Sequence, residues 1–304
     1  MLITEKLKLK DILSKTEEEI ADFFLKEGEN LANYSSRSLA EATYTSPATI
    51  VRMCKRLGFS GFDDFKEQFL AELQYLDRQT GEVDVNFPFA RGDSPMKAAN
   101  SIARLYEEVT RDTLALLGND MLQKAVRILR SSQNVCIYSM GTAINQAECF
   151  REKMLKIGKR VTISSNLNYQ LYEAGCLTVK DAAIIISYSG ETRKTLQIAS
   201  ECRKHHVPVI AITSFGENSL AKYATCRLTL STRESMFQNL GDFSSHLSVS
   251  LLLDILYSAY FLQDYDSHYE KKLEKTRMLE KFRKSSNSVI MGDEGTNAFL
   301  KPTT

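Results

Sequence analysis

The sequence lacks several features that would place it in common protein classes. Its 304 residues hold no apolar run approaching the ~18 residues that a membrane-spanning helix needs. The first residues, MLITEKLKLKD, are charged where a signal peptide requires an apolar core. None of the six cysteines forms a C-x-x-C pair or has a histidine at zinc-ligand spacing. We therefore expect a cytoplasmic protein with reduced thiols, no metal or other cofactor, and no membrane partner.

A surplus of positive charge is also absent. The net charge is +1, and residues 1–77 hold ten Lys and Arg against fourteen Asp and Glu. Composition alone therefore does not predict binding to nucleic acid, and any such function must rest on a local motif. The hydrophobic fraction of 43% and the charged fraction of 25% are ordinary for a soluble globular protein.

The pattern along the chain predicts five zones. They are a helical domain (1–77), a linker with two of the five prolines (78–95), a connecting helix (96–119), an α/β domain (120–265), and a charged helix with a loose tail (266–304). Apolar β-like runs lie at 134–139, 160–164, 182–187, 207–213 and 226–231. Such strands, joined by helices, favour a flavodoxin-like five-stranded parallel sheet covered on both faces. A nearly all-apolar helix expected at 244–262 must be buried, in the core or at a subunit interface.

Residues 38–66 read as two short helices and a turn. Ser46 is a favoured N-cap, Pro47 a favoured first helical residue, and Gly58 a common helix end. Apolar side chains recur at helical spacing on one side of the second helix: Ile50, Met53, Cys54 and Leu57. Between Glu41 and Asp63 there is no acidic residue, so the opposite side is positive. Arg52 is placed to reach guanine in the major groove, and Lys55 and Arg56 can neutralise the charge of the DNA backbone. The residues expected to contact DNA are Ser46, Thr49, Arg52, Lys55, Arg56 and Arg37.

From the pattern alone, an amphipathic helix pair with a solvated charged face remains the alternative. The segment TSPATIVRMCKRLGFSGFDDFK, however, resembles the signature of the RpiR family of bacterial regulators. That family's frame, G-[FY]-S-G-[FY]-x-x-[FL]-[KR], is filled here by Gly58, Phe59, Ser60, Gly61, Phe62, Phe65 and Lys66. The resemblance implies a helix-turn-helix that binds double-stranded operator DNA.

A second motif, ISYSGETRKT at 186–195, runs from an apolar strand into an amphipathic helix. Backbone N–H groups at a helix N-terminus, together with the hydroxyls of Ser187, Ser189 and Thr192, suit an anion, and Gly190 permits close approach. The alternative is an ordinary strand-to-helix turn capped by a hydroxyl.

S-x-S-G-x-T after an apolar strand also resembles the sugar isomerase (SIS) domain, over about residues 120–262. The resemblance implies that Ser187, Ser189 and Thr192 grip the phosphate of a phosphosugar. The family's G-x-G-x-S loop is here Ser139-Met140-Gly141-Thr142-Ala143, which keeps one glycine and lacks the final serine. The downstream stretch STRESMFQNLGDFSSHLSVSLLLDILY also resembles the family's regulators, which implies that Glu234 and Ser235 line the site from a loop. The phosphosugar-binding residues are therefore predicted to be Ser187, Ser189, Gly190, Thr192, Ser139, Gly141, Thr142 and Glu234.

SIS domains serve both isomerases and regulators. An isomerase needs a base near C1 and C2 of the sugar. His205 and His206 follow the end of a helix opposite to the phosphate-binding end, and His246 is open to a structural role or a ligand contact. Glu173 and Glu234 are possible bases without a defined partner. No catalytic residue is therefore assigned.

The prediction is a transcriptional regulator of sugar metabolism genes, a repressor rather than an activator. The resemblance implies that a hexose or amino-sugar 6-phosphate modulates its DNA affinity. A homodimer or homotetramer is expected on the operator. The alternatives are a phosphosugar isomerase and a non-regulatory phosphosugar-binding protein.

Overall fold

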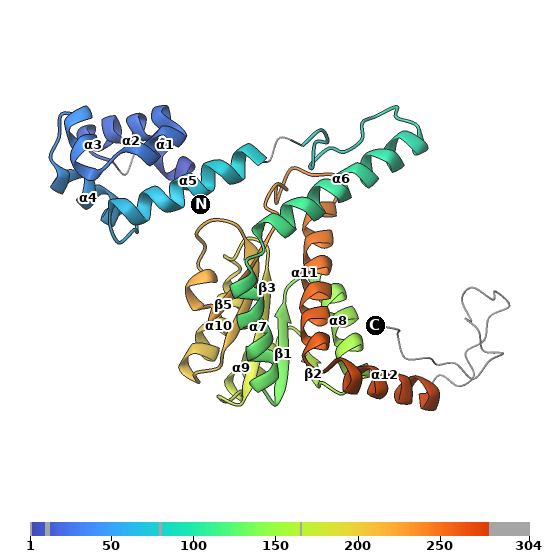
Figure 1. The fold of residues 1–304 in the computed structure, drawn as a ribbon. Helices are drawn as coiled ribbons and strands as arrows, with labels where there is room; N and C mark the ends of the chain where they lie inside the picture. Colours follow the sequence, from blue (N-terminus) through green and yellow to red (C-terminus); the bar gives the residue numbers. More distant parts are fainter. Residues whose placement is uncertain (1, 10–12, 79–80, 165, 280–304) are drawn as a thin grey trace.

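The computed structural model describes residues 2–9, 13–78, 81–164 and 166–279, which form a helical N-terminal domain and an α/β domain (Figure 1). Residues 280–304, which include the expected loose tail (285–304), lie outside the described residues. The N-terminal domain projects from the α/β domain, and α5 points back from it toward the linker (Figure 1). Its helices are α1 (Ile3–Lys8), α2 (Lys15–Glu27), the 3-10 helix η2 (Gly28–Asn33), α3 (Ser36–Ala42), α4 (Pro47–Arg56) and α5 (Phe62–Arg78).

Local sequence signals set these helices. The Ser46 hydroxyl accepts from the Thr49 N–H, and Pro47 stands at the first helical position, as expected from the sequence. Tyr44, in the turn between α3 and α4, has a φ of 51°. Apolar side chains from all five α-helices form one core, which includes a cluster of phenylalanine rings: Phe24, Phe59, Phe62, Phe65 and Phe69.

A long helix joins the two domains. After the linker, α6 (Pro95–Leu116) begins with Ser94 as its N-cap, and α7 (Asn119–Ser131) follows. Buried Leu105 and Val109 of α6 pack with Val85 of the linker, so part of the linker has its own small core.

The α/β domain contains an all-parallel sheet in the order β2-β1-β3-β4-β5. Its strands are β1 (Asn134–Ser139), β2 (Val161–Ile163), β3 (Asp181–Ser187), β4 (Val209–Ser214) and β5 (Cys226–Leu230). The remaining elements are α8 (Ala143–Lys156), α9 (Gln170–Gly175), α10 (Arg193–Lys204), η3 (Ala221–Tyr223), α11 (Phe243–Phe261), η4 (Leu262–Asp264) and α12 (Tyr265–Leu279). This order confirms the flavodoxin-like fold predicted from the apolar runs.

Helices cover both faces of the sheet. Apolar residues of α7, α8 and α11 pack on one face, and those of α9 and α10 pack on the other. The helix between β2 and β3 is shorter than expected, since α9 has only six residues. Because β2 and β3 lie on opposite sides of β1, the switch point of the topology falls between β1 and β3. Ligands of open α/β sheets bind at the carboxyl ends of the strands at such a point.

One sequence expectation needs correction. Within the described part of the chain, the continuous helical stretch Phe243–Leu279 is long and apolar enough, by length and composition, to cross a membrane. The expectation that no segment comes near this limit was therefore wrong, because the many Leu, Ile and Val side chains of α11 outweigh its serines and the single Asp254. Leu252, Leu253 and Leu256 of that helix are buried against the sheet.

Candidate DNA interface and ligand site

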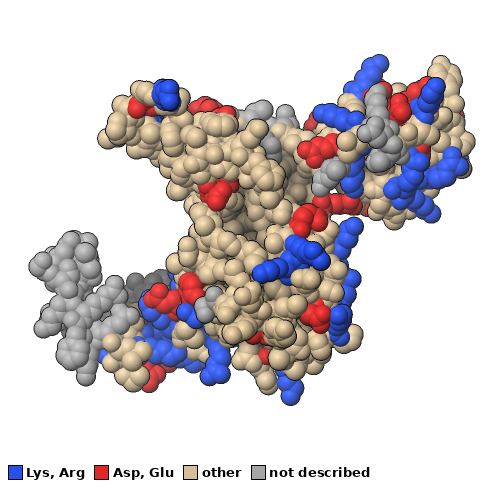
Figure 2. All heavy atoms as spheres, turned by 180° about the vertical axis from the view of Figure 1, so that it is seen from behind, with Lys and Arg blue, Asp and Glu red and all other residues tan. Residues whose placement is uncertain are grey.

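Helix α4 presents two chemically distinct sides. Ile50, Met53 and Cys54 are fully buried, whereas Arg52 and Lys55 are exposed. Neither of these two cations has an ion-pair partner among the described residues, and the same is true of exposed Arg37 on α3. Lys and Arg side chains gather over the outer part of the N-terminal domain (Figure 2). The outer side of α4 is therefore positive although the domain as a whole is acidic.

Arg56 differs from the other expected DNA contacts. Its guanidinium forms an ion pair with Glu17 of α2, a buried residue that also accepts from the N–H and hydroxyl of Ser14. Burial raises the pKa of Glu17, but the Ser14 hydrogen bonds and the Arg56 charge outweigh this and hold it below 4.5. Arg56 thus ties the end of α4 to the start of α2.

Replacing Arg56 by Ala is expected to lower the free energy of unfolding by about 1–2 kcal/mol at pH 7, because Glu17 loses its charge partner. Since the folded-state pKa of Glu17 is lowered from 4.5, the pair stabilises above that pH, and the stabilisation is lost as the pH falls through the lowered pKa. Urea denaturation at pH 7 and in acid measures the difference. Arg52→Ala is the matched control, and equal stability of wild type and Arg56→Ala at pH 7 would contradict the assignment.

A cavity of about 200 Å³ opens at the carboxyl ends of β1 and β3. Three segments surround it: the β1 loop (139–142), the β3 loop (187–192) and the β5 loop (231–242), together with the first turns of α8 and α11. Its lining residues are Ser139, Met140, Thr142, Ala143, Ile186, Ser187, Tyr188, Glu234, Ser235, Met236, Asp242, Ser245, His246 and Val249. The cavity therefore lies at the switch point of the sheet.

The β3 loop carries the hydroxyl-rich motif. Ser187 Oγ lies 3.3 Å from Thr192 Oγ1, and Ser189 Oγ accepts from the Glu191 N–H. Thr192 is the N-cap of α10 but makes no side-chain cap hydrogen bond, so the first turn of this helix has no side-chain cap. Gly190 has a φ of 67°, and a Cβ there would lie 2.2 Å from Asn218 Oδ1. Only glycine fits at this position without strain.

The β1 loop meets α11 across the cavity. Thr142 Oγ1 and His246 Nε2 share a hydrogen bond of 2.6 Å, and His246 Nε2 lies 3.9 Å from Asp242. Gly141 has a φ of 75°, and the hydroxyl of buried Ser139 donates a long hydrogen bond of 3.4 Å to the Met140 carbonyl. Thr142 and His246 thus form one wall of the cavity.

Glu234 is held as a cap rather than as a free acid. Its carboxylate accepts from the N–H groups of Ser244 and Ser245 at 3.0 and 3.1 Å, at the start of α11. The Tyr188 hydroxyl donates to the Glu234 carbonyl at 2.7 Å, and burial raises the pKa of that hydroxyl. The β5 loop is therefore fixed to both α11 and the β3 loop.

The cavity brings together four of the eight residues predicted for phosphosugar binding: Ser139, Thr142, Ser187 and Glu234. The other four, Ser189, Gly190, Thr192 and Gly141, do not line it, although Thr192 lies next to Ser187. Sequence reasoning did not assign Tyr188, Asp242 and Ser245 to the site, and it left His246 open. The i, i+4 spacing of Asp242 and His246 at a helix start was the one local signal for them.

Comparisons with known proteins agree with this architecture. The helix-turn-helix domain of the rpiR family matches residues 1–75, and the SIS domain matches residues 128–259. An uncharacterized HTH-type transcriptional regulator of Haemophilus influenzae is 26% identical over 247 residues, which are 81% of this chain and 85% of that protein. Another, of Caldanaerobacter subterraneus subsp. tengcongensis, is 27% identical over 272 residues, 90% of this chain and 94% of that protein.

A solved structure shares the whole fold. It is the Vibrio vulnificus NanR protein complexed with ManNAc-6P, which has a TM-score of 0.59, is 21% identical, and covers 93% of this chain and 99% of its own. The DNA-reading helices and the parallel α/β domain together define a helix-turn-helix transcriptional regulator with a C-terminal SIS domain. The chain belongs to the rpiR family of such regulators.

Proposed function

We propose that the SIS domain binds a hexose or amino-sugar 6-phosphate, and that this ligand changes the affinity of the helix-turn-helix for operator DNA. The observation that carries the proposal is the β3 loop at the switch point. There the Ser187 and Thr192 hydroxyls lie together at a helix start that lacks a side-chain cap. Free N–H groups and hydroxyls at a helix N-terminus are the groups that hold a phosphate. That NanR is complexed with ManNAc-6P supports the ligand class.

The first turn of α10 adds favourable charge. It contains no acidic residue and begins with exposed Arg193 and Lys194. A phosphate seated at this end faces both the helix dipole and these cations. The sugar ring then points toward Thr142 and His246, whose hydroxyl and imidazole suit recognition of sugar hydroxyls.

Binding without turnover fits the way in which Glu234 and His246, two of the acid–base groups in the cavity, are held. Both carboxylate oxygens of Glu234 already accept backbone N–H groups, so Glu234 acts as a cap of α11. His246 is engaged with Thr142 and lies near Asp242. An isomerase would need one of these groups free to move a proton between neighbouring carbons. We therefore assign no catalytic residue and propose a sensor.

The wider proposal is a cytoplasmic repressor that acts as a homodimer or homotetramer. The relatives are HTH-type transcriptional regulators, and reading of two operator half-sites calls for a symmetric oligomer. The half-exposed remainder of α11 offers an apolar surface for such an assembly. Equilibrium sedimentation of the full chain, free and on DNA, tests this; a monomer in both states would contradict it.

The experiment for the function is fluorescence anisotropy on DNA from upstream of the chain's own operon, at fixed salt. Glucosamine 6-phosphate, N-acetylmannosamine 6-phosphate and fructose 6-phosphate are added in turn, each beside its unphosphorylated sugar. One phosphorylated sugar is expected to change the DNA affinity by about 5- to 150-fold, and its unphosphorylated form is not. Turnover of any of them, with no effect on DNA binding, would favour the isomerase.

A further inference from the structure

The β4 loop (214–220) lies between the candidate phosphate site and the DNA-binding domain. On its inner side it is bonded to the β3 loop at three points: Ser214 N–H to Tyr188 O, Ser219 N–H to Glu191 Oε1, and Leu220 N–H to Gly190 O. These hydrogen bonds are 3.1, 2.8 and 3.0 Å long. Asn218, which is buried, packs directly over Gly190. A change in the β3 loop therefore displaces the β4 loop with it.

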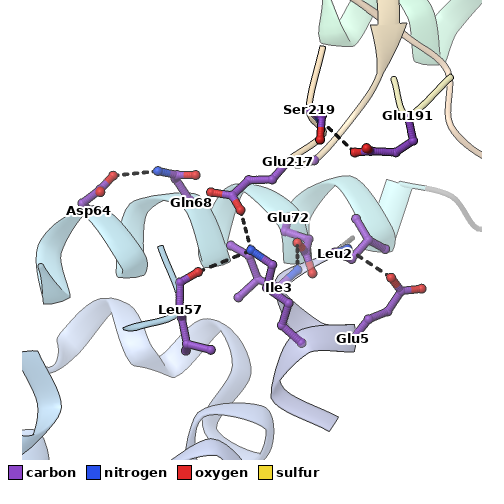
Figure 3. A network of polar contacts seen from close by, with 12 residues as sticks. Leu2, Ile3, Glu5, Leu57, Asp64, Gln68, Glu72, Glu191, Glu217 and Ser219 are labelled. Carbon is purple, nitrogen blue, oxygen red and sulfur yellow. Dashed lines mark hydrogen bonds and ion pairs between the residues drawn. The ribbon is translucent and has the colours of Figure 1, made fainter. Parts of the chain in front are cut away.

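On its outer side the same loop holds the N-terminal domain. Glu217 forms an ion pair with Lys6 of α1, and Lys6 also donates to the carbonyl of Leu57, the C-cap residue of α4. In Figure 3, Glu217 points from the β4 loop toward the N-terminal domain, while Ser219 lies beside Glu191. The chain of contacts thus runs from the β3 loop to the end of the helix expected to read DNA.

An aromatic contact runs parallel to this ion pair. The rings of Phe215 and Tyr75 stack with their centroids 4.3 Å apart. The Tyr75 hydroxyl accepts from the Thr232 N–H, and Thr232 Oγ1 accepts from the Phe215 N–H, both at 2.7 Å. Thr232 belongs to the β5 loop, which forms another wall of the cavity. The β4 loop, which is bonded to the β3 loop, and the β5 loop, which borders the cavity, therefore both meet the N-terminal domain.

On the N-terminal side of the junction, a buried carboxylate joins α1 to α5. Glu72 of α5 is buried and accepts from the backbone N–H groups of Ile3 and Thr4 and from the Thr4 hydroxyl (Figure 3). This carboxylate fixes α1 against α5, so Lys6 and Tyr75 move as one body. A displacement of the β4 loop is then passed to α4 instead of being absorbed by α1.

We propose that the β4 loop relays occupation of the sugar phosphate site to the DNA-reading helix through the Glu217–Lys6 ion pair and the Phe215–Tyr75 stack. This rests on the proposed function. A phosphate that draws the Ser187 and Thr192 hydroxyls inward shifts Gly190 and Glu191, and the β4 loop follows through its three hydrogen bonds. The structures with and without bound sugar phosphate then differ in where Lys6 holds the end of α4. Coupling between two sites requires such a contact that differs between the two states.

The test measures the ligand response of Glu217→Gln in the full chain. Anisotropy gives the affinity for operator DNA with and without the three sugar phosphates named above, and calorimetry gives the affinity for the sugar phosphate. We expect both separate affinities to stay within about threefold of wild type, while the ligand-induced change in DNA affinity falls from about 5–150-fold to less than about threefold. The charge swap Lys6→Glu with Glu217→Lys is expected to restore most of the response.

Glu201→Gln on α10 is the matched control, since it removes a carboxylate paired with Lys204 away from the junction. It is expected to respond as wild type does. A Glu217→Gln variant that keeps the full response would overturn the relay and leave the sensor intact. If none of the sugar phosphates alters DNA binding by wild type, the proposed function itself fails, and the relay fails with it.

Discussion

Replacing Arg52 and Lys55 together by Ala is expected to weaken operator binding by about 100-fold at fixed salt, because one base contact and one phosphate contact are lost. Both side chains are exposed on α4, and neither has an ion-pair partner among the residues that the structure describes. Arginine in the major groove pairs with guanine, and lysine neutralises a phosphate and releases a counterion. Anisotropy at several salt concentrations separates the two contributions. Each lost phosphate contact reduces the slope of log affinity against log salt by about 0.9.

The matched control replaces Lys15 and Lys26 by Ala. These lysines are exposed on α2 of the same domain, so the variant loses the same charge from a helix other than α4. The control is expected to lose affinity for specific and unrelated DNA equally and only slightly. The α4 variant is expected to lose its preference for the operator as well. Equal behaviour of the two variants would show that α4 is not the reading helix.

The sequence predicted most of the fold because its signals are local. Five apolar runs marked the five strands, and Ser46 with Pro47 marked the start of α4. The signature around Gly58 and the S-x-S-G-x-T motif identified the two domains, which the family comparisons confirm. Each of these features is encoded by a few consecutive residues, so backbone propensity and capping signals are enough to predict it.

Features that depend on distant residues could not be read in this way. The ion pair between Arg56 and Glu17 joins residues 39 positions apart. It gives a structural role to Arg56, which the sequence alone indicated only as a DNA contact. The start of α11 lines the cavity together with the β5 loop, because the Glu234 carboxylate of that loop caps the helix. The contact between Lys6 and Glu217 spans 211 positions. No local pattern encodes these contacts, since they arise only when the elements pack.

The second large effect is expected at the β3 loop. Changing Ser187 to Ala and Thr192 to Val removes the two hydroxyls that lie 3.3 Å apart beside the start of α10. Hydrogen bonds to a charged group contribute about 1.5–3 kcal/mol each, so the affinity for a sugar phosphate is expected to fall by about 100-fold or more. DNA binding without ligand is expected to stay at the wild-type level, because neither residue lies in the N-terminal domain. Calorimetry and anisotropy on the same preparation measure the two affinities.

Ser200→Ala, farther along α10, is the control for loss of a hydroxyl from the same helix. It is expected to bind sugar phosphate normally. The double variant changes the phosphate site without changing the contacts of the β4 loop. That loop is bonded to the Tyr188 and Gly190 carbonyls and to Glu191, not to the two hydroxyls. Lost ligand affinity together with normal DNA affinity therefore assigns the defect to the site. If the variant binds the sugar phosphate as wild type does, the phosphate must lie elsewhere along the cavity, and the Thr142–His246 wall becomes the next place to test.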